Sequence, residues 1–383
     1  MPWKCVDVME ERIKFIFLAL QNGVNFSRLC YNFGISRPTG YLWLNRYLES
    51  GSFAAVGELS RRPHHTANKT SRDLESRVIA LRRKHGWGAR KLRELLLRDG
   101  LDMKEATINR ILKRNDLIKP EDSHRPALKR FERERPNELW QMDFKGDYKA
   151  DEGRCYPLSL LDDCSRFAVG LYALSRQNTP VVYNSLVHAF ETYGVPEAML
   201  MDHGVPWWST TNGHGLTRLS VRLVKQGIKL RFSGVRHPQT QGKVERFHRT
   251  LEHAVNHHGK PTSMSGWKQM FTYFIDEYNR IRPHEALQMD VPANRYKPSP
   301  KAYNPNPPEW EYPLGSTVKR LNPQGCFDYR HRRLFVCEAL GGERVQIQKT
   351  DNKLLVKFRN VYIREINTKN GRSVSLLTPV LKT

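Results

Sequence analysis

The chain has 383 residues, with 63 Lys and Arg against 39 Asp and Glu, and a formal net charge of +24. Its apolar stretches are too short for a membrane span, and no signal-peptide pattern opens it, so a membrane protein is not expected. The length suits about two to four domains. So basic a chain is expected to bind a polyanion, most commonly nucleic acid.

The distribution of charge and the cysteine content further narrow the class of protein. Residues 1–137 hold 28 Lys and Arg against 16 Asp and Glu, so positive charge is densest there. The six cysteines include no C-x-x-C pair, which argues against a disulfide framework or a cysteine zinc site. Free thiols fit a reducing cytoplasm, where we expect this protein.

The first helical region carries the pattern of a helix-turn-helix unit. Apolar spacing predicts a helix over 11–20 and a short helix over 26–33. Gly34 then provides a turn, and Ser36 can cap a third helix that runs to about Leu48. A plain three-helix bundle fits the same pattern, and the basic setting favours DNA binding through the third helix.

A second unit of the same kind follows the basic stretch SRRPHHTANKT. Helices are predicted over 71–84, 89–98 and 104–114, with glycines between them. The last of these, in KEATINRILKRNDLI, is a candidate recognition helix for phosphates and base edges. Residues 118–136 have mixed charge and several prolines, which is typical of a linker.

The pattern changes to strands and helices after residue 137. ELWQMDFKG alternates, so Trp140 and Asp143 are expected on opposite faces of a strand. YPLSLLDDCSRFAVGLYAL predicts two strands in a hairpin joined at 162–166. Thr179 is expected to cap a helix that ends at Gly194, because a proline follows it.

The remainder of this region completes a mixed sheet with helices on its faces. EAMLMD is a short strand ending in Asp202, and 228–232 is another strand. Helices are predicted over 216–226, from near Gly242, and in WKQMFTYFIDEYNRI. The expected order is β-β-β-α-β-α-β-α-α. Beyond a proline-rich linker, short alternating strands predict a small β-barrel or sandwich.

Three carboxylates stand out as candidate metal ligands. Asp143 and Asp202 lie at or near strand ends, and Glu245 begins a helix that can pack across the same sheet. Hard oxygen donors suit Mg²⁺ or Mn²⁺, and two such ions can support phosphodiester displacement. For Glu245 the alternative is a surface ion pair with Arg249 one turn on.

Five blocks carry a family resemblance: WQMDFKG, LLDDCSRFAVG, LMDHGVPWWS, HPQTQGKVERFHRTL and YNRIRPHEAL. In this order they resemble bacterial insertion-sequence transposases with a retroviral-integrase core, the DDE family. Helix-turn-helix units ahead of the core and a β domain behind it fit the same family. The resemblance implies an RNase H-like core with Asp143, Asp202 and Glu245 as the metal-binding, catalytic triad.

The chain departs from the family pattern in two places. The 42 residues between Asp202 and Glu245 exceed the usual interval, and the extra length is expected in WWSTTNGHG. His203 stands where an Asn is common. Asp162 and Asp163 are interpreted as turn residues. For His237 and His284, DNA contact and loop shaping are equally open.

Candidate DNA contacts come from the recognition helices and from the helix of Glu245. They are Arg37, Arg46, Asn109, Arg110, Lys113, Arg114, Lys243, Arg246 and Arg249. For the last three, a solvated basic face is the alternative.

The expected architecture is multidomain, with all-α, α/β and all-β parts. The predicted ranges are helix-turn-helix domains at 1–57 and 66–118, a linker at 119–137, an RNase H-like core at 138–300, a linker at 301–312 and a small β-barrel at 313–383.

The resemblance implies a Mg²⁺-dependent transposase that cuts the terminal repeats of its mobile element and joins them to target DNA. Double-stranded DNA would be its partner, and a homo-oligomer on paired ends is expected. Two rivals are a defective relative acting as a DNA-binding regulator and a stand-alone RNase H-like nuclease. Three retained acids argue against the first, and two recognition units against the second.

Overall fold

A computed structural model describes residues 8–58, 70–118, 133–209, 215–233 and 242–377. The chain divides into two compact units, residues 1–71 and 72–383. In the described ranges no helix is long and apolar enough to cross a membrane. The SRRPHHTANKT stretch and the 119–137 linker lie mostly outside these ranges, so their prediction is not tested.

The first unit is the predicted three-helix bundle. Its helices are α1 (Val8–Ala19), α2 (Phe26–Asn32) and α3 (Arg37–Ser50), followed by a 3₁₀ turn at Phe53–Val56. Ser36 caps α3 by accepting a hydrogen bond from the amide of Thr39. Gly40 lets α3 approach closely, because a Cβ there would lie 2.7 Å from the Cys30 sulfur.

The second unit begins with the other predicted helical triplet: α4 (Arg72–His85), α5 (Ala89–Arg98) and α6 (Glu105–Arg114). These helices enclose a separate apolar core that includes Val78, Leu92 and Ile108. The observed bounds agree with the predicted ones to within one residue. Strong amphipathic patterning explains this agreement, since each helix has one apolar stripe to bury.

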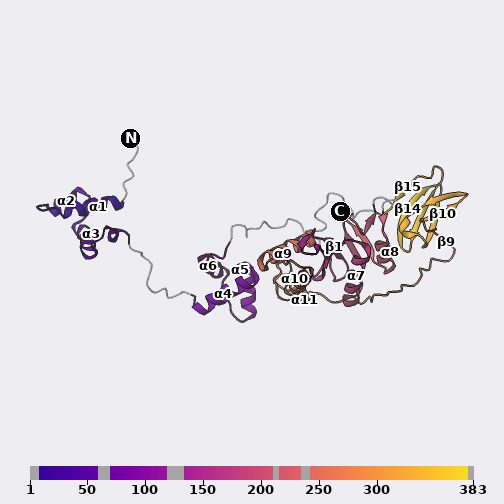
Figure 1. Ribbon diagram of the computed structural model, residues 1–383, viewed down its shortest axis with the longest axis horizontal. Coiled ribbons are helices and arrows are strands. Elements are labelled where there is room, and N and C mark those ends of the chain that lie inside the picture. The colour runs from indigo at the N-terminus through magenta and orange to yellow at the C-terminus, as the bar shows by residue number, and fades with distance from the viewer. Residues whose placement is uncertain (1–7, 59–69, 119–132, 210–214, 234–241, 378–383) are drawn as a thin grey trace. The chain divides into compact units, whose positions relative to one another are not determined.

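A six-stranded sheet forms the centre of the second unit (Figure 1). Its strands are β1 (Trp140–Phe144), β2 (Tyr148–Ala150), β3 (Gly153–Asp162), β4 (Ala168–Leu174), β5 (Ala198–Met201) and β8 (Lys229–Phe232). The order is β2-β3-β1-β5-β8, with β4 paired to β3. β3 runs antiparallel to its neighbours, whereas β1, β5 and β8 are parallel to one another.

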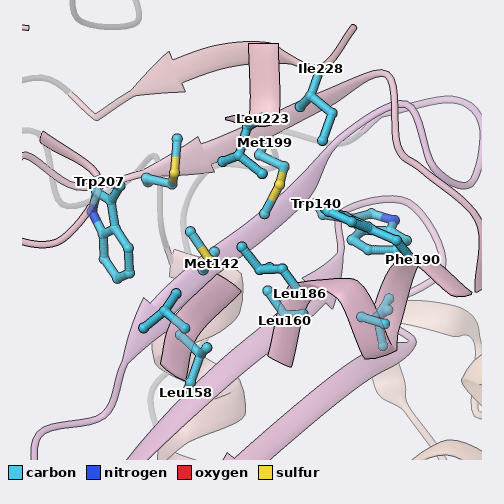
Figure 2. Packing of buried hydrophobic residues seen from close by; sticks show 14 of the residues in the cluster. Trp140, Met142, Leu158, Leu160, Leu186, Phe190, Met199, Trp207, Leu223 and Ile228 are labelled. Carbon is cyan, nitrogen blue, oxygen red and sulfur yellow. The ribbon is translucent and has the colours of Figure 1, made fainter. Parts of the chain in front are cut away.

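Helices cover both faces of this sheet. One face packs against α7 (Thr179–Tyr193) and α8 (Arg218–Lys225), and Figure 2 shows Trp140, Phe190 and Leu186 in that core. The other face packs against α9 (Gly242–His258) and α10 (Met264–Asp276), through residues such as Phe247 and Trp267. A π-helical segment (Glu277–Ile281), a 3₁₀ turn (Glu285–Leu287) and α11 (Pro292–Arg295) follow.

Three local details differ from the predictions. Asn178, not Thr179, caps α7, because its side chain accepts the amide hydrogen of Val181 and leaves Thr179 inside the first turn. The helix expected from Leu216 starts two residues later, after a capping box at Thr217. β2 and the pair β6 (Trp208–Ser209) and β7 (Gly215–Leu216) were not predicted, since such short strands carry no alternation.

The last part of the chain is all β. Strands β9 (Thr317–Arg320), β12 (Arg344–Thr350), β13 (Lys353–Phe358), β14 (Val361–Asn367) and β15 (Ser373–Ser375) form an antiparallel sheet in the order β15-β14-β13-β12-β9. A hairpin, β10 (Cys326–Tyr329) and β11 (Arg332–Phe335), shares its core. Val221 and Val224 of α8 join that core, so this part packs directly on the central sheet's helix layer.

Candidate active site

The sheet places Asp143 and Asp202 side by side. Asp143 lies near the carboxyl end of β1, and Asp202 directly follows β5. The parallel register pairs Trp140 with Met199 and Gln141 with Leu200, so two further residues bring Asp143 level with Asp202. Neighbouring strands lie about 4.8 Å apart, which puts both carboxylates at one edge of the sheet.

Helix α9 brings Glu245 toward the same edge. The amide of Val244 donates to the Gln141 side-chain oxygen on β1 at 3.2 Å. One turn later, the His248 ring lies 2.9 Å from the Ser159 hydroxyl on β3. These contacts fix the first turn of α9 over the two strands. Glu245 itself is exposed.

Asp202 and Glu245 act electrostatically on Asp143. Burial, followed by the negative charges of Asp202 and Glu245, raises the pKa of Asp143 to about 7. Asp202 is tied to its own loop, because it accepts hydrogen bonds from the Trp207 indole at 2.7 Å and from the Gly204 amide at 2.9 Å. Within the described ranges, no three His, Cys, Asp or Glu side chains already meet as a metal-ligating group.

His248 is a site residue that the sequence reasoning missed. Its ring lies 3.8 Å from the Asp143 carboxylate, and burial together with Lys145 lowers its pKa to about 4. A neutral imidazole at pH 7 leaves the charge of Asp143 uncompensated. The signal was present in the sequence, since His248 continues the buried stripe of Val244 and Phe247.

The hairpin residues Asp162 and Asp163 are structural, as interpreted from the turn pattern. Asp162 accepts from the amides of Asn137 and Ser165, which closes the turn. Asp163 is fully buried and forms a 2.6 Å ion pair with Lys243, the second residue of α9. Lys243, predicted to contact DNA phosphates, therefore has its ammonium group held inside the protein.

The other candidate DNA contacts lie on helix surfaces. Arg37 on α3 and Asn109, Arg110 and Lys113 on α6 are exposed, as are Arg246 and Arg249 on α9. Two more are engaged within the protein. Arg46 stacks over Trp43 at 4.7 Å, and Arg114 makes a hydrogen bond and an ion pair with the Glu75 carboxylate.

Three histidines of the family-like sequence blocks, His203, His237 and His284, were singled out in the sequence. His203 packs its ring against Trp208 and Phe232. His284 donates from Nε2 to the Tyr278 carbonyl, and its backbone carbonyl accepts from Leu287 and Met289, so it shapes its loop. His237 lies outside the described residues. The tip of the long WWSTTNGHG loop does too, and its flanks pair as β6 and β7.

Family profiles match the chain in two regions. The Integrase core domain matches residues 133–238 and 226–292, and the Homeodomain-like domain matches residues 8–57 and 39–112. The predicted integrase-type core and the DNA-binding type of the helical units are thereby confirmed.

Two proteins of mobile elements are similar in sequence. The transposase for transposon Tn552 of Staphylococcus aureus is 28% identical over 192 residues, 43% of this chain and 38% of that protein. An uncharacterised 31.7 kDa protein of insertion element IS407 from Burkholderia multivorans is 24% identical over 241 residues, 58% of this chain and 81% of that protein. The chain thus spans well under half of the Tn552 protein's length and most of the IS407 protein's.

Two solved structures show a weaker likeness. The simian T-cell lymphotropic virus intasome with PP2A regulatory subunit B56 gamma has a TM-score of 0.38 at 15% identity, covering 79% of this chain and 99% of that chain. The HTLV-2 integrase catalytic core domain with magnesium has a TM-score of 0.33 at 14% identity, covering 42% and 97%. The chain therefore matches the Integrase core domain over residues 133–292 and is similar in sequence to a transposon's transposase and to an insertion-element protein.

Proposed function

We propose that the protein is a DNA transposase that binds the terminal inverted repeats of its mobile element, cleaves them and transfers the freed ends to target DNA. The observation that carries this proposal is the β1–β5 register, which sets Asp143 level with Asp202. The anchoring of α9 to Gln141 adds Glu245 to the same edge of the sheet.

The proposed ligands for Mg²⁺, or Mn²⁺ in its place, are Asp143, Asp202 and Glu245. The donor set fits a hard divalent cation, because it consists of carboxylate oxygens whose mutual repulsion a cation relieves. A bound pair of such ions would supply Lewis-acid activation of a water or hydroxyl and stabilisation of the leaving oxygen. The chain's own part is positioning: Trp207 and Gly204 orient Asp202, and Gln141 holds α9 in place.

Removal of divalent metal ions by a chelator should stop DNA cleavage without stopping DNA binding. With excess EDTA, cleavage of a labelled terminal-repeat duplex should stop, because uncompensated carboxylates repel the phosphodiester. Restored Mg²⁺ or Mn²⁺ should bring cleavage and strand transfer back, while a shift assay shows end binding throughout. Equal cleavage with and without divalent ions, after the protein has been stripped of metal, would contradict the proposal.

End recognition is assigned to the helical units, with α3 and α6 as the helices that enter the major groove. Asn109, Arg110 and Lys113 share the outward face of α6, whereas Ile108 and Leu112 bury the inward face. Asn suits adenine edges, and Arg or Lys suits guanine edges or phosphates.

Substitutions on α6 should affect DNA binding in two different ways, depending on whether the residue contacts a base edge or a phosphate. Asn109→Ala should cost about 1–3 kcal/mol and relax preference at one base pair, while Lys113→Ala should weaken binding to all sequences and lower the salt slope by about one. Arg114→Gln is the matched control, because Glu75 already engages that guanidinium. Competition shift assays with randomised ends distinguish these effects. Identical losses for all three variants would overturn the assignment.

We further propose that the five-stranded sheet and the β10–β11 hairpin form a small barrel, since they share one core. Two ends must be joined in one event, so at least two protomers should bridge them. Sedimentation with paired ends tests this, and one protomer on each isolated end would refute it. The site of action would be the bacterial nucleoid in the cytoplasm.

A further inference from the structure

The helical triplet α4–α6 is joined to the catalytic core by a buried polar pair. His85, the last residue of α4, has its Nδ1 atom 2.5 Å from Oε1 of Glu277 in the π-helical segment after α10. The two side chains are 3% and 5% exposed. The His85 ring also stacks on Trp87, with 4.5 Å between the ring centres. Because the pair is shielded from water, loss of one member would leave the other buried without this partner.

Further hydrogen bonds join the same two parts of the chain. Near the end of α9, Nε2 of His257 donates to the Arg83 carbonyl of α4 at 2.8 Å. The Arg98 guanidinium at the end of α5 donates to the carbonyls of Ile281 and Met289 at 3.1 and 3.0 Å. The Ile281 side chain packs against the apolar core of the triplet. Together with the buried pair, these contacts form what we call the docking junction.

The end of α4 is shaped for a close approach to α9. Gly86, which follows α4, has a φ of +68°, a conformation that residues with a side chain rarely adopt. A Cβ at this position would lie 2.9 Å from Nδ1 of His257. The Gly86 carbonyl accepts a 2.6 Å hydrogen bond from the Arg82 guanidinium. A larger residue here would therefore push α4 away from α9.

The core's part of the docking junction is itself bonded to the central sheet. Asn279, in the middle of the π-helical segment, donates to the Ala168 carbonyl at 3.0 Å and accepts from the Ala168 amide at 2.8 Å. Ala168 is the first residue of β4. Glu277 and Asn279 are both buried. Short π-helical segments are rare and occur frequently at functional sites. Here one such segment is bonded both to the sheet and to α4.

Helix α9 connects the docking junction with the candidate active site. Its first turn contains Glu245 and is anchored to Gln141 of β1, and its last turn contains His257. The separation of Glu245 and His257 in sequence corresponds to about 18 Å along the helix axis, at about 1.5 Å per residue. A single continuous helix thus links α4 to one of the three carboxylates.

The DNA-reading face of the triplet remains exposed in this arrangement. The docking junction uses α4 and α5, whereas Asn109, Arg110 and Lys113 of α6 are exposed. The opposite face of α6 contributes Ile108 and Leu112 to the core that it shares with α4 and α5. Contacts that fix α4 and α5 therefore also fix the helix assigned to base recognition.

We propose that His85 and Glu277 are positioning residues that hold the second helix-turn-helix unit on the catalytic core, so that DNA is cut at a fixed distance from the sequence read by α6. The inference rests on the proposed function, because it requires recognition by α6 and cleavage at the carboxylates. The contrasting arrangement is a tethered unit, which would only raise the local concentration of DNA near the carboxylates. A tether tolerates a change of spacing, and a fixed unit does not.

Duplexes of altered spacing distinguish the two arrangements. Three base pairs are inserted in both terminal repeats, between the sequence protected by α6, as located by footprinting, and the cleaved phosphodiester. The insertion displaces that bond by about 10 Å. Full-length wild-type protein should cut the displaced bond about a hundredfold more slowly than the native one, because small misplacements of reacting groups already cost that much. A shift assay should show equal binding to both duplexes. Equal cutting rates would overturn the proposal.

The ratio of the two cleavage rates, displaced over native, reports on the docking junction. In Glu277→Ala this ratio should rise about tenfold or more, because α4 loses its buried partner and the unit can follow the DNA. Glu277→Gln should keep the wild-type ratio, since its amide oxygen can still accept from the His85 ring. A general loss of stability lowers both rates equally and leaves the ratio unchanged. An unchanged ratio in folded Glu277→Ala protein would contradict the positioning role.

Arg98→Ala carries the test if thermal unfolding shows that Glu277→Ala does not fold. It removes two hydrogen bonds to carbonyls of the core from an exposed side chain, and the ratio should rise in the same direction. Arg93→Ala is the matched control. Arg93 lies on the same helix but donates to groups inside the triplet, so the ratio should equal that of the wild type. Equal ratios in the two arginine variants would refute the docking role of Arg98.

These outcomes separate the docking junction from the proposed function. Cleavage by the wild type that tolerates the insertion, or a ratio that no junction variant changes, would overturn the fixed spacing and leave the transposase assignment standing. Failure of the wild type to bind or cut the native terminal repeats would overturn the transposase assignment itself.

Discussion

Replacing Glu245 with glutamine should abolish metal-dependent cleavage and strand transfer while leaving binding to the terminal repeats intact. Glutamine keeps the side chain's size and its place on α9 but removes the charge that holds a cation. Residues that merely orient metal ligands cost about 10–100-fold when mutated, so loss of a ligand should cost more. The side chain is exposed, so stability should change by at most about 0.5 kcal/mol.

The matched control is Glu191→Gln, the same change at an exposed position of α7. Both variants are compared with the wild type in a cleavage assay on labelled duplex, beside a shift assay on the same preparations. Near-normal cleavage by folded Glu245→Gln protein would restore the alternative of a surface ion pair with Arg249.

Asp143→Asn and Asp202→Asn should behave like Glu245→Gln, and a double variant should be little worse than a single one. Ligands of one site act as a unit, so the second loss removes nothing that still functions. Additive losses in the double variant would show that the carboxylates act separately.

The sequence predicted those parts of the fold that have a strong local signal. The bounds of α5 agree with the expected range, since an amphipathic stripe and flanking glycines mark both ends. Strand β1 was recognised from alternation, and its Trp140 and Met142 side chains lie in the core. Strands of two or three residues, such as β2 and β6, were missed because no period can be read from so few positions.

Contacts between distant segments were not predictable from local patterns. His85 and Glu277 lie 192 residues apart in the chain, and neither has an unusual neighbourhood in sequence. Likewise, nothing near His248 indicates Ser159 as its partner. The triad was proposed through a family resemblance, because spacing alone gives many acidic triples. The structure contributes the strand register that sets Asp143 and Asp202 level.

Lys243 illustrates the difference between a pattern and a packed structure. In KVERFHRT it is one of several cations, and the sequence favoured a phosphate contact for all of them. In the structure its side chain is 15% exposed, and its partner Asp163 is fully buried. Asp163 also accepts from the Gln141 side chain, which in turn holds the amide of Val244. The hairpin thus supports the helix turn that carries Glu245.

Breaking this pair should therefore destabilise the core and impair catalysis together. Lys243→Met leaves a buried carboxylate without its cation, and Asp163→Ala removes the carboxylate that pairs with the ammonium group of Lys243 and accepts from the Gln141 side chain. Each should lower the free energy of unfolding by about 3–5 kcal/mol. Cleavage should fall as well, because the first turn of α9 loses its anchor. Urea unfolding of the full-length protein, beside the cleavage assay, measures both effects.

If Lys243 instead contacts a DNA phosphate, its replacement should weaken DNA binding and leave stability unchanged. Arg249→Met shows what loss of such a surface cation looks like. Arg249 is exposed on the same helix, so its loss should cost little stability and should act through DNA affinity and salt dependence. If Lys243 is an internal anchor, the Lys243→Met and Asp163→Ala double variant should be less destabilised than the sum of the singles, because both remove one interaction. Lys243→Met protein with wild-type stability and a reduced salt slope would instead return Lys243 to the DNA-binding surface.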